Sequence, residues 1–419
     1  MPNAIDRPRP LGPATEQPTL KRSLTLPLVV LYGLGVTIGA GIYVLVGATA
    51  GVAGIYAPLA FVLAALVMLP SACSFAELVG RFPVSAGEAA YVRAGFNSQT
   101  WSIIVGLLVV SAGTVSAATI SLGSIGYIRQ FVDLPSLVLI PIVVACMTLI
   151  AAWGVRESVI FAAVMTFVEI IGLLMVIVGG FFGASFGSVA ASASSLPDGM
   201  TLMQIGFGVM SGGVLAFFAF IGFEDLVNMA EETRDPGTTM PKAIFLTLII
   251  STILYVLISV VAVLNVPVQQ LANAEAPLSL VFERTTGASS ITISAIAIIA
   301  TLNGVIIQII MGSRVLYGLS RTGGIPSVFG YVHPLTRTPL VATATVGALI
   351  FILATLVPLR GLAEWTSQIT LTIFGLVNLA LWLIKRRGDV APEGTYINPQ
   401  WVPIVGLICC IVFLVVGVL

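Results

Sequence analysis

The sequence predicts an all-α integral membrane protein with eleven transmembrane helices, and three observations lead to this fold class. Of the 419 residues, 58% are hydrophobic and only 9% are charged, against about 25% charged residues in soluble domains. Long windows contain no Asp, Glu, Lys or Arg, whereas a membrane-spanning helix needs only roughly 20 apolar residues. Two of these windows are interrupted by glycine-rich segments in matching positions of the two halves of the chain.

The predicted helices follow from these windows in chain order. The first window, 23–76, is long enough for two helices, and "GVAGIYAP" near its middle supplies the turn. The stretch 158–197, in which Glu169 is the one charged residue, gives the fifth helix. Each of the other windows gives one helix: 94–128, 134–155, 199–223, 243–274, 285–313, 338–359, 365–384 and 394–419. Runs this long are helical, because barrel strands alternate over only about ten residues.

The positions of the Lys and Arg residues predict the orientation in the membrane. If the N-terminus is cytoplasmic, all of them except Arg129, Arg284 and Arg360 fall in cytoplasmic segments, as the positive-inside rule requires. We therefore expect a multi-pass protein of the cell (inner or plasma) membrane, with a proline-rich cytoplasmic tail at 1–22 and an external C-terminus.

The composition also argues against several partners. The net charge is zero, so no basic field attracts nucleic acid. The four cysteines all fall inside apolar windows, which predicts neither a disulfide framework nor a metal site, and we expect no cofactor.

The interruptions of the first and sixth predicted helices are the clearest functional signal. "GLGVTIGAGIYVLVG" (33–47) places five glycines inside an apolar run, and "SGGVLAFFAFIGFE" (211–224) interrupts the sixth helix. Glycine is about 1 kcal/mol worse than alanine inside a helix, so both helices are expected to unwind there. The two breaks stand five helices apart, in the first and the sixth helix, and such a pair indicates an inverted-repeat transporter. Alternatively, Gly35 and Gly39 form a GxxxG packing motif, and packing and unwinding can coexist.

Four stretches of the chain resemble the amino acid–polyamine–organocation (APC) permeases, in the bacterial branch similar to cationic amino acid transporters. They are the glycine-rich first break, "FAELVGRFPVSAGEAAYVRAGF" (75–96), "FFAFIGFEDLVNMAEETRDPGTTMPKAI" (217–244) and "GSRVLYGLSRTGGIPSVFGYVHPLTRTP" (312–339). The resemblance implies a LeuT-type fold of five plus five helices and amino acid transport by alternating access, driven by protons or by exchange. It covers a transporter core at 23–387, with repeats at about 23–182 and 200–387, and leaves 394–419 as an additional eleventh helix.

The same resemblance assigns a substrate site to the two breaks. It implies that the substrate carboxylate meets the amides of Gly39, Ala40 and Gly41, near the hydroxyl of Thr37. The ammonium group would meet carbonyl groups freed around Thr37, Ile38, Phe218, Ala219 and Ile221, with the Phe218 ring as a lid over the substrate. For the neighbouring aromatic rings, ordinary packing or lipid contact is the alternative.

Two carboxylates are candidates for proton coupling. Glu169 lies near the middle of the fifth helix, where relatives often have lysine, and a charge at that depth costs at least a few kcal/mol, which favours the protonated acid. The alternatives for Glu169 are a permanently protonated acid or a sodium ligand. Glu224 follows the second break directly and could respond to pH, or it could be a solvated helix end. Thr301 and Asn303 could complete a sodium site or bond to neighbouring helices.

The leading functional hypothesis is a secondary active amino acid permease, most simply a proton symporter. The alternatives are an amino acid/amine exchanger and a channel. An intramembrane enzyme is excluded by the absence of HExxH and of any histidine or Asp pair within the spans. Glu77, Arg81, Glu88 and Arg93 are expected at the cytoplasmic ends of helices, as gate ion pairs or as solvated ends. With only Glu169 and Glu224 as acids near the site, the sequence favours a small or apolar neutral amino acid.

Overall fold

The computed structural model describes residues 22, 24–39, 41–83, 87–153, 159–183, 201–321 and 323–417. The predicted tail up to residue 21, Ala40 of the first break and the segment 184–200 lie outside these residues. Within them, all regular structure is helical except one isolated bridge between Leu24 and Thr233. The predicted all-α class is therefore confirmed.

The helices follow the apolar windows closely. In the first half they are α1 (Leu26–Ile38), α2 (Gly41–Ala53), η1 (Gly54–Tyr56), α3 (Ala57–Arg81), α4 (Gly87–Phe96), α5 (Gln99–Ile128), α6 (Ser136–Trp153) and α7 (Val159–Phe182). In the second half they are α9 (Leu202–Phe218), η2 (Phe223–Glu232), α10 (Pro236–Asn265), α11 (Val268–Ala272), α12 (Pro277–Thr286), α13 (Ile291–Arg321), η3 (Ser327–Gly330), α14 (Leu340–Leu356), α15 (Leu359–Arg387) and α16 (Val402–Val416).

Eight helical runs among the described residues are long and apolar enough to cross a membrane, if α2 and α3 are counted as the single run Gly41–Arg81 and α9 and η2 as the single run Leu202–Glu232. Three shorter apolar helices are α1, α14 and α16. Each predicted span coincides with at least one of these helices, but helix lengths alone do not fix the number of crossings. Eleven crossings therefore stay a prediction.

Three short helices lie at the ends of predicted spans or in the connections between them. They are α4, α11 and α12. α12 begins with Pro277 in its first turn and ends before Gly287, which adopts a left-handed conformation with φ of 66°. This combination of an N-terminal proline and a C-terminal glycine is a local helix signal. A polar connection can therefore be helical without crossing a membrane.

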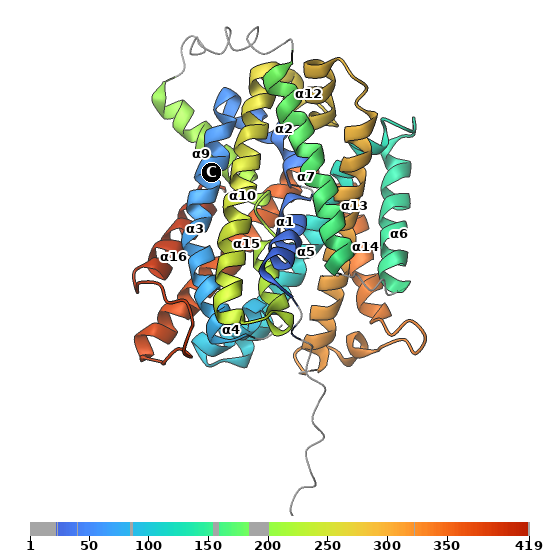
Figure 1. Cartoon of the computed structure of the whole chain (residues 1–419). Coiled ribbons are helices and arrows are strands. Elements are labelled where there is room, and N and C mark those ends of the chain that lie inside the picture. Colours follow the sequence, from blue (N-terminus) through green and yellow to red (C-terminus); the bar gives the residue numbers. More distant parts are fainter. Residues whose placement is uncertain are drawn as a thin grey trace, which may run out of the picture.

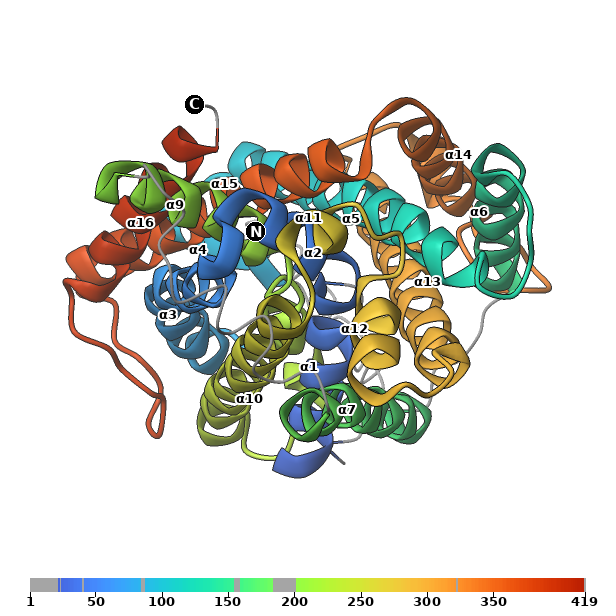
Figure 2. The ribbon, with the colours of Figure 1, turned by 90° about the horizontal axis from the view of Figure 1, so that it is seen from above.

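The two interrupted helices run in opposite directions through the centre of the molecule. α1 packs against η2, whereas α2 packs against α9, so the first half of one helix contacts the second half of the other. The chain before α1 also pairs with the end of η2, because the Leu24 amide donates to the Glu232 carbonyl at 3.0 Å. Figure 1 shows α1 below α2, and Figure 2 shows both near the centre, with α6 and α14 at one side and α16 at another.

The outer helices expose large apolar side chains. Examples are Leu137 and Leu149 on α6, and Phe167 and Phe182 on α7. In water such a surface would be a liability, but in a bilayer it is the surface that contacts lipid.

Candidate functional site

The first break lies at the predicted position. α1 ends at Ile38 and α2 begins at Gly41, and Gly39 between them has a non-helical backbone with φ of −19° and ψ of −94°. Thr37 and Ile38 occupy the last turn of α1 and are both buried. The interruption therefore sits inside the protein and not at a lipid-facing surface.

The second break also matches the prediction. α9 ends at Phe218, and the following turn tightens, since the Ile221 amide donates to the Phe218 carbonyl at 3.2 Å. Gly222 has φ of 123°, which disfavours any residue with a side chain. Its amide donates to Glu224 Oε2 at 2.8 Å, so this carboxylate holds the end of the turn.

The two breaks touch each other through glycines. A Cβ atom added to Gly41 would lie 2.3 Å from Cα of Ala219, and one added to Gly222 would lie 2.9 Å from the carbonyl oxygen of Val36. A Cβ on Gly35 would lie 2.1 Å from Oγ1 of Thr166 on α7. Packing and unwinding thus coexist, because Gly35 and Gly41 permit close contacts on either side of the break.

Tyr255 on α10 joins both breaks, and nothing in the sequence had singled it out. Its hydroxyl group lies 2.8 Å from the Thr37 carbonyl oxygen and 2.9 Å from that of Ala219, and its single proton serves these two acceptors. The ring is fully buried and packs on Phe61 and Phe220. Two carbonyl groups predicted to be free for the substrate therefore already have a donor.

We expect Tyr255→Phe to destabilise the protein by about 1 kcal/mol, the scale of an interhelical hydrogen bond in a membrane protein. The reason is that two buried carbonyl groups lose their shared donor while the ring packing stays. Thermal unfolding in detergent measures the effect. Tyr331→Phe is the matched control, because Tyr331 is exposed. Equal unfolding temperatures for the two variants would contradict the bridging role.

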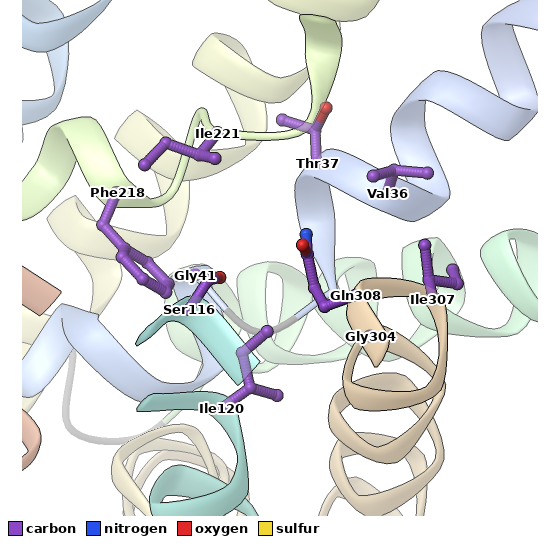
Figure 3. A pocket seen from close by; sticks show the side chains of 10 residues that line it. All are labelled: Val36, Thr37, Gly41, Ser116, Ile120, Phe218, Ile221, Gly304, Ile307 and Gln308. Atoms are coloured by element: carbon purple, nitrogen blue, oxygen red, sulfur yellow. The ribbon is translucent and has the colours of Figure 1, made fainter. Parts of the chain in front are cut away.

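A cavity opens beside the breaks, with an empty volume of about 390 Å³ including its open side. It is lined by Val36, Thr37, Gly41, Ser116, Ile120, Phe218, Ile221, Gly304, Ile307 and Gln308. Figure 3 shows Gln308 pointing from α13 towards α1, with Phe218 on the opposite side of the space. We call this space the central cavity.

The central cavity gathers some of the predicted substrate residues. Thr37, Gly41, Phe218 and Ile221 line it. Ile38, Gly39 and Ala219 do not appear in its lining, and Ala40 lies outside the described residues. The other aromatic rings of the second break pack away from it: Phe217 contacts Phe374 and Phe413, and Phe220 contacts Tyr255.

A second space, which we call the inner cavity, continues the central one towards α4 and has an empty volume of about 370 Å³ including its open side. Ser116, Ile221 and Gln308 line both. The remaining lining residues are Glu88, Val109, Ala112, Gly113, Glu224, Asp225, Met311, Thr370 and Ile373. Burial raises the pKa of Glu88 to about 7.

Glu169 lies apart from both cavities, on α7. Its side chain is 1% exposed, and neither carboxylate oxygen has a hydrogen-bond partner among the described residues. Its main-chain carbonyl accepts a hydrogen bond from the Tyr43 hydroxyl group at 3.0 Å, and the Tyr127 hydroxyl donates in turn to the Tyr43 carbonyl. These bonds place Glu169 beside the first turn of α2, directly after the break.

The other polar candidates have different environments. The Thr301 hydroxyl donates to carbonyl groups of its own helix, at Ala297 (2.7 Å) and Ile298 (3.1 Å). Neither Thr301 nor Asn303 lines the central or inner cavity; the residues of α13 that do are Gly304, Ile307, Gln308 and Met311.

The acidic and basic residues at the predicted helix ends separate into two groups. Glu77 is fully buried and pairs with Arg81 at 2.9 Å and with Lys385 at 2.7 Å. Glu88, by contrast, lines the inner cavity. Among the described residues, Glu77 and Arg81 therefore form an expected ion pair, whereas Arg93 is exposed.

Comparison with known proteins agrees with this architecture. A family model described as "Amino acid permease" matches residues 24–419. The branched-chain amino acid permease BcaP of Bacillus subtilis is 31% identical over 90% of this chain and 83% of its own length. An uncharacterised transporter of Mycobacterium tuberculosis is 31% identical over 96% and 88%.

A plant relative is more distant. The vacuolar cationic amino acid transporter 4 of Arabidopsis thaliana is 29% identical, and the match covers 92% of this chain but 65% of that longer protein. Proteins with these names are transporters and not enzymes. With its apolar helices, this chain is a multi-pass membrane protein, and it belongs to the amino acid permease family of the APC superfamily.

Proposed function

We propose that the protein is a secondary active transporter that moves an amino acid across the cytoplasmic membrane by alternating access. The observation that carries this proposal is the meeting of two antiparallel interrupted helices at the central cavity. Discontinuous helices of this kind bind charged groups at mid-membrane with their amide and carbonyl ends. The inverted repeats at about 23–182 and 200–387, the cytoplasmic N-terminus and the external C-terminus are parts of the same proposal.

The substrate's backbone groups would occupy the first break and the central cavity. We place the carboxylate at the amides of Gly39, Ala40 and Gly41, with Thr37 nearby. The ammonium group would lie at carbonyl groups of Thr37, Ile38, Phe218, Ala219 or Ile221, where Phe218 closes one side of the cavity. Tyr255 would hold the Thr37 and Ala219 carbonyls in place while they bind.

For the coupling ion we propose the proton, with Glu169 as its carrier. Support comes from its burial and from two carboxylate oxygens without partners, since an isolated ionised acid inside a membrane is costly and takes up a proton readily. Glu224 is the second candidate, because it ends the α9 turn and lines the inner cavity. A sodium site at Thr301 and Asn303 is the weaker alternative.

Purified protein in liposomes is expected to accumulate an amino acid when an inward proton gradient is imposed. The relatives' names cover branched-chain and cationic amino acids, so the panel of labelled substrates should include both classes. Uptake that requires amino acid or amine inside the vesicle would identify an exchanger. If folded protein gives neither uptake nor exchange with the whole panel, the proposed function is wrong.

A further inference from the structure

Three carboxylates from two elements meet at the inner cavity. Glu88 comes from α4, and Glu224 and Asp225 come from η2. No described residue in the lining is basic, and none of the three acids forms an ion pair in the described part of the chain. All three side chains are less than one tenth exposed. Buried like charges without a counter-charge are unfavourable, and a bound cation would relieve this cost.

Two further side chains in the lining have unused hydrogen-bonding groups. Gln308 is 7% exposed and Thr370 is 2% exposed, and neither Gln308 Oε1 nor Thr370 Oγ1 has a partner among the described residues. Gln308 Oε1 lies close to α5, because a Cβ atom added to Gly113 would be 2.7 Å from it. Buried polar groups are nearly always hydrogen-bonded to protein or to water, so these two oxygens are available to accept hydrogen bonds from a ligand.

The apolar part of the lining indicates which kind of molecule would bear the cationic group. Besides the acids, the inner cavity is lined by the apolar side chains of Val109, Ala112, Met311 and Ile373, which suit methylene groups. Ser116, Ile221 and Gln308 belong to both cavities, so one ligand could extend from the breaks to the acids. A molecule held at the breaks by its carboxylate and ammonium groups would direct a long side chain along this path.

We propose that the inner cavity binds an ammonium or guanidinium group on an aliphatic arm, and that this arm is the basic side chain of the transported amino acid. Glu88, Glu224 and Asp225 accept charge-assisted hydrogen bonds from the cationic group, and Gln308 Oε1 accepts another. This inference rests on the proposed function and replaces the earlier preference for a neutral amino acid, because Glu88 and Asp225 add two carboxylates that the sequence did not place near the site.

The test compares L-lysine, L-leucine and 1,5-diaminopentane as ligands of the full-length protein in liposomes. Lysine is expected to bind about tenfold more tightly than leucine or better, because hydrogen bonds to charged groups in a buried site are strong. Diaminopentane lacks the carboxylate, and weaker binding than that of lysine identifies the arm as part of an amino acid. Equal binding of diaminopentane and lysine would show that a free amine occupies the cavity and would overturn the assignment to a side chain.

Glu88→Gln and Asp225→Asn remove a charge while preserving side-chain size, and each is expected to lower the lysine-to-leucine affinity ratio by about tenfold. Two variants on different elements guard against the failure of one to fold. Glu393→Gln is the matched control, because Glu393 is exposed and outside both cavities. An unchanged ratio in both folded variants would overturn the inference.

The outcomes also separate this inference from the proposed function. Uptake of leucine without any binding of lysine would refute the cationic site and leave amino acid transport standing. Absence of transport for every amino acid would refute the proposed function itself.

Discussion

Replacing Gly41 with alanine is expected to weaken amino acid binding by roughly tenfold to a hundredfold. The added methyl group would lie 2.3 Å from Cα of Ala219 and 2.7 Å from its Cβ, so the two breaks must move apart. Overpacking of this kind costs about 1–3 kcal/mol, which corresponds to that range of affinity. Gly41 also lines the central cavity, so the displacement changes the space that the substrate would occupy.

Removing the side chain of Ala219 is not expected to restore the affinity that Gly41→Ala loses. In the double variant Gly41→Ala with Ala219→Gly, the contact to Cα of Ala219 remains, because only the Cβ atom is removed. Gly206→Ala is the control: Gly206 lies in α9, and a Cβ atom there would meet nothing within 4 Å. Isothermal titration or a substrate-dependent thermal shift measures binding. Wild-type affinity in Gly41→Ala would show that the breaks are not a single binding unit.

The positions of the breaks could be predicted from the sequence because their cause is local. Glycines in an apolar run lower helix stability at their own position, so Gly41 and Gly222 mark the interruptions without any knowledge of neighbours. The hydropathy of the sequence predicted the spanning helices for the same reason, because each apolar window is also a local feature. The contacts that these glycines make, with Ala219 and Val36, depend on helix packing, and the pattern alone left packing and unwinding as alternatives.

The residues that the sequence did not reveal depend on contacts between distant segments. Tyr255 lies in an apolar span and has no motif around it, yet its hydroxyl group reaches both breaks. Glu88 was expected at a helix end, as part of an ion pair or in solvent. It lines the inner cavity because α4 forms a helix and packs beside η2. Gln308 was missed in favour of Thr301, whose hydroxyl group is bonded within its own helix.

Replacing Glu169 with glutamine is expected to abolish proton-driven accumulation while amino acid exchange continues. The carboxylate is 1% exposed and has no hydrogen-bond partner or ion pair among the described residues, so its ionised form is costly and its protonated form is favoured. Such a group releases its proton when water or a cation reaches it as the site opens to the other side. Glutamine has nearly the same shape but cannot carry a proton.

The measurement uses liposomes containing wild type, Glu169→Gln or Glu224→Gln, each assayed with a proton gradient, with a sodium gradient and under exchange conditions. A carrier at Glu169 predicts loss of proton-driven accumulation in Glu169→Gln alone. Loss of proton-driven accumulation only in Glu224→Gln would identify Glu224 as the proton carrier instead. Glu224 lies at the end of the turn after α9, where it accepts a hydrogen bond from the Gly222 amide. Sodium-driven accumulation that disappears in Glu169→Gln would instead make the carboxylate a sodium ligand. If Glu169→Gln keeps full proton-driven accumulation, Glu169 is structural, and its contact with Tyr43 serves only to hold α7 against α2.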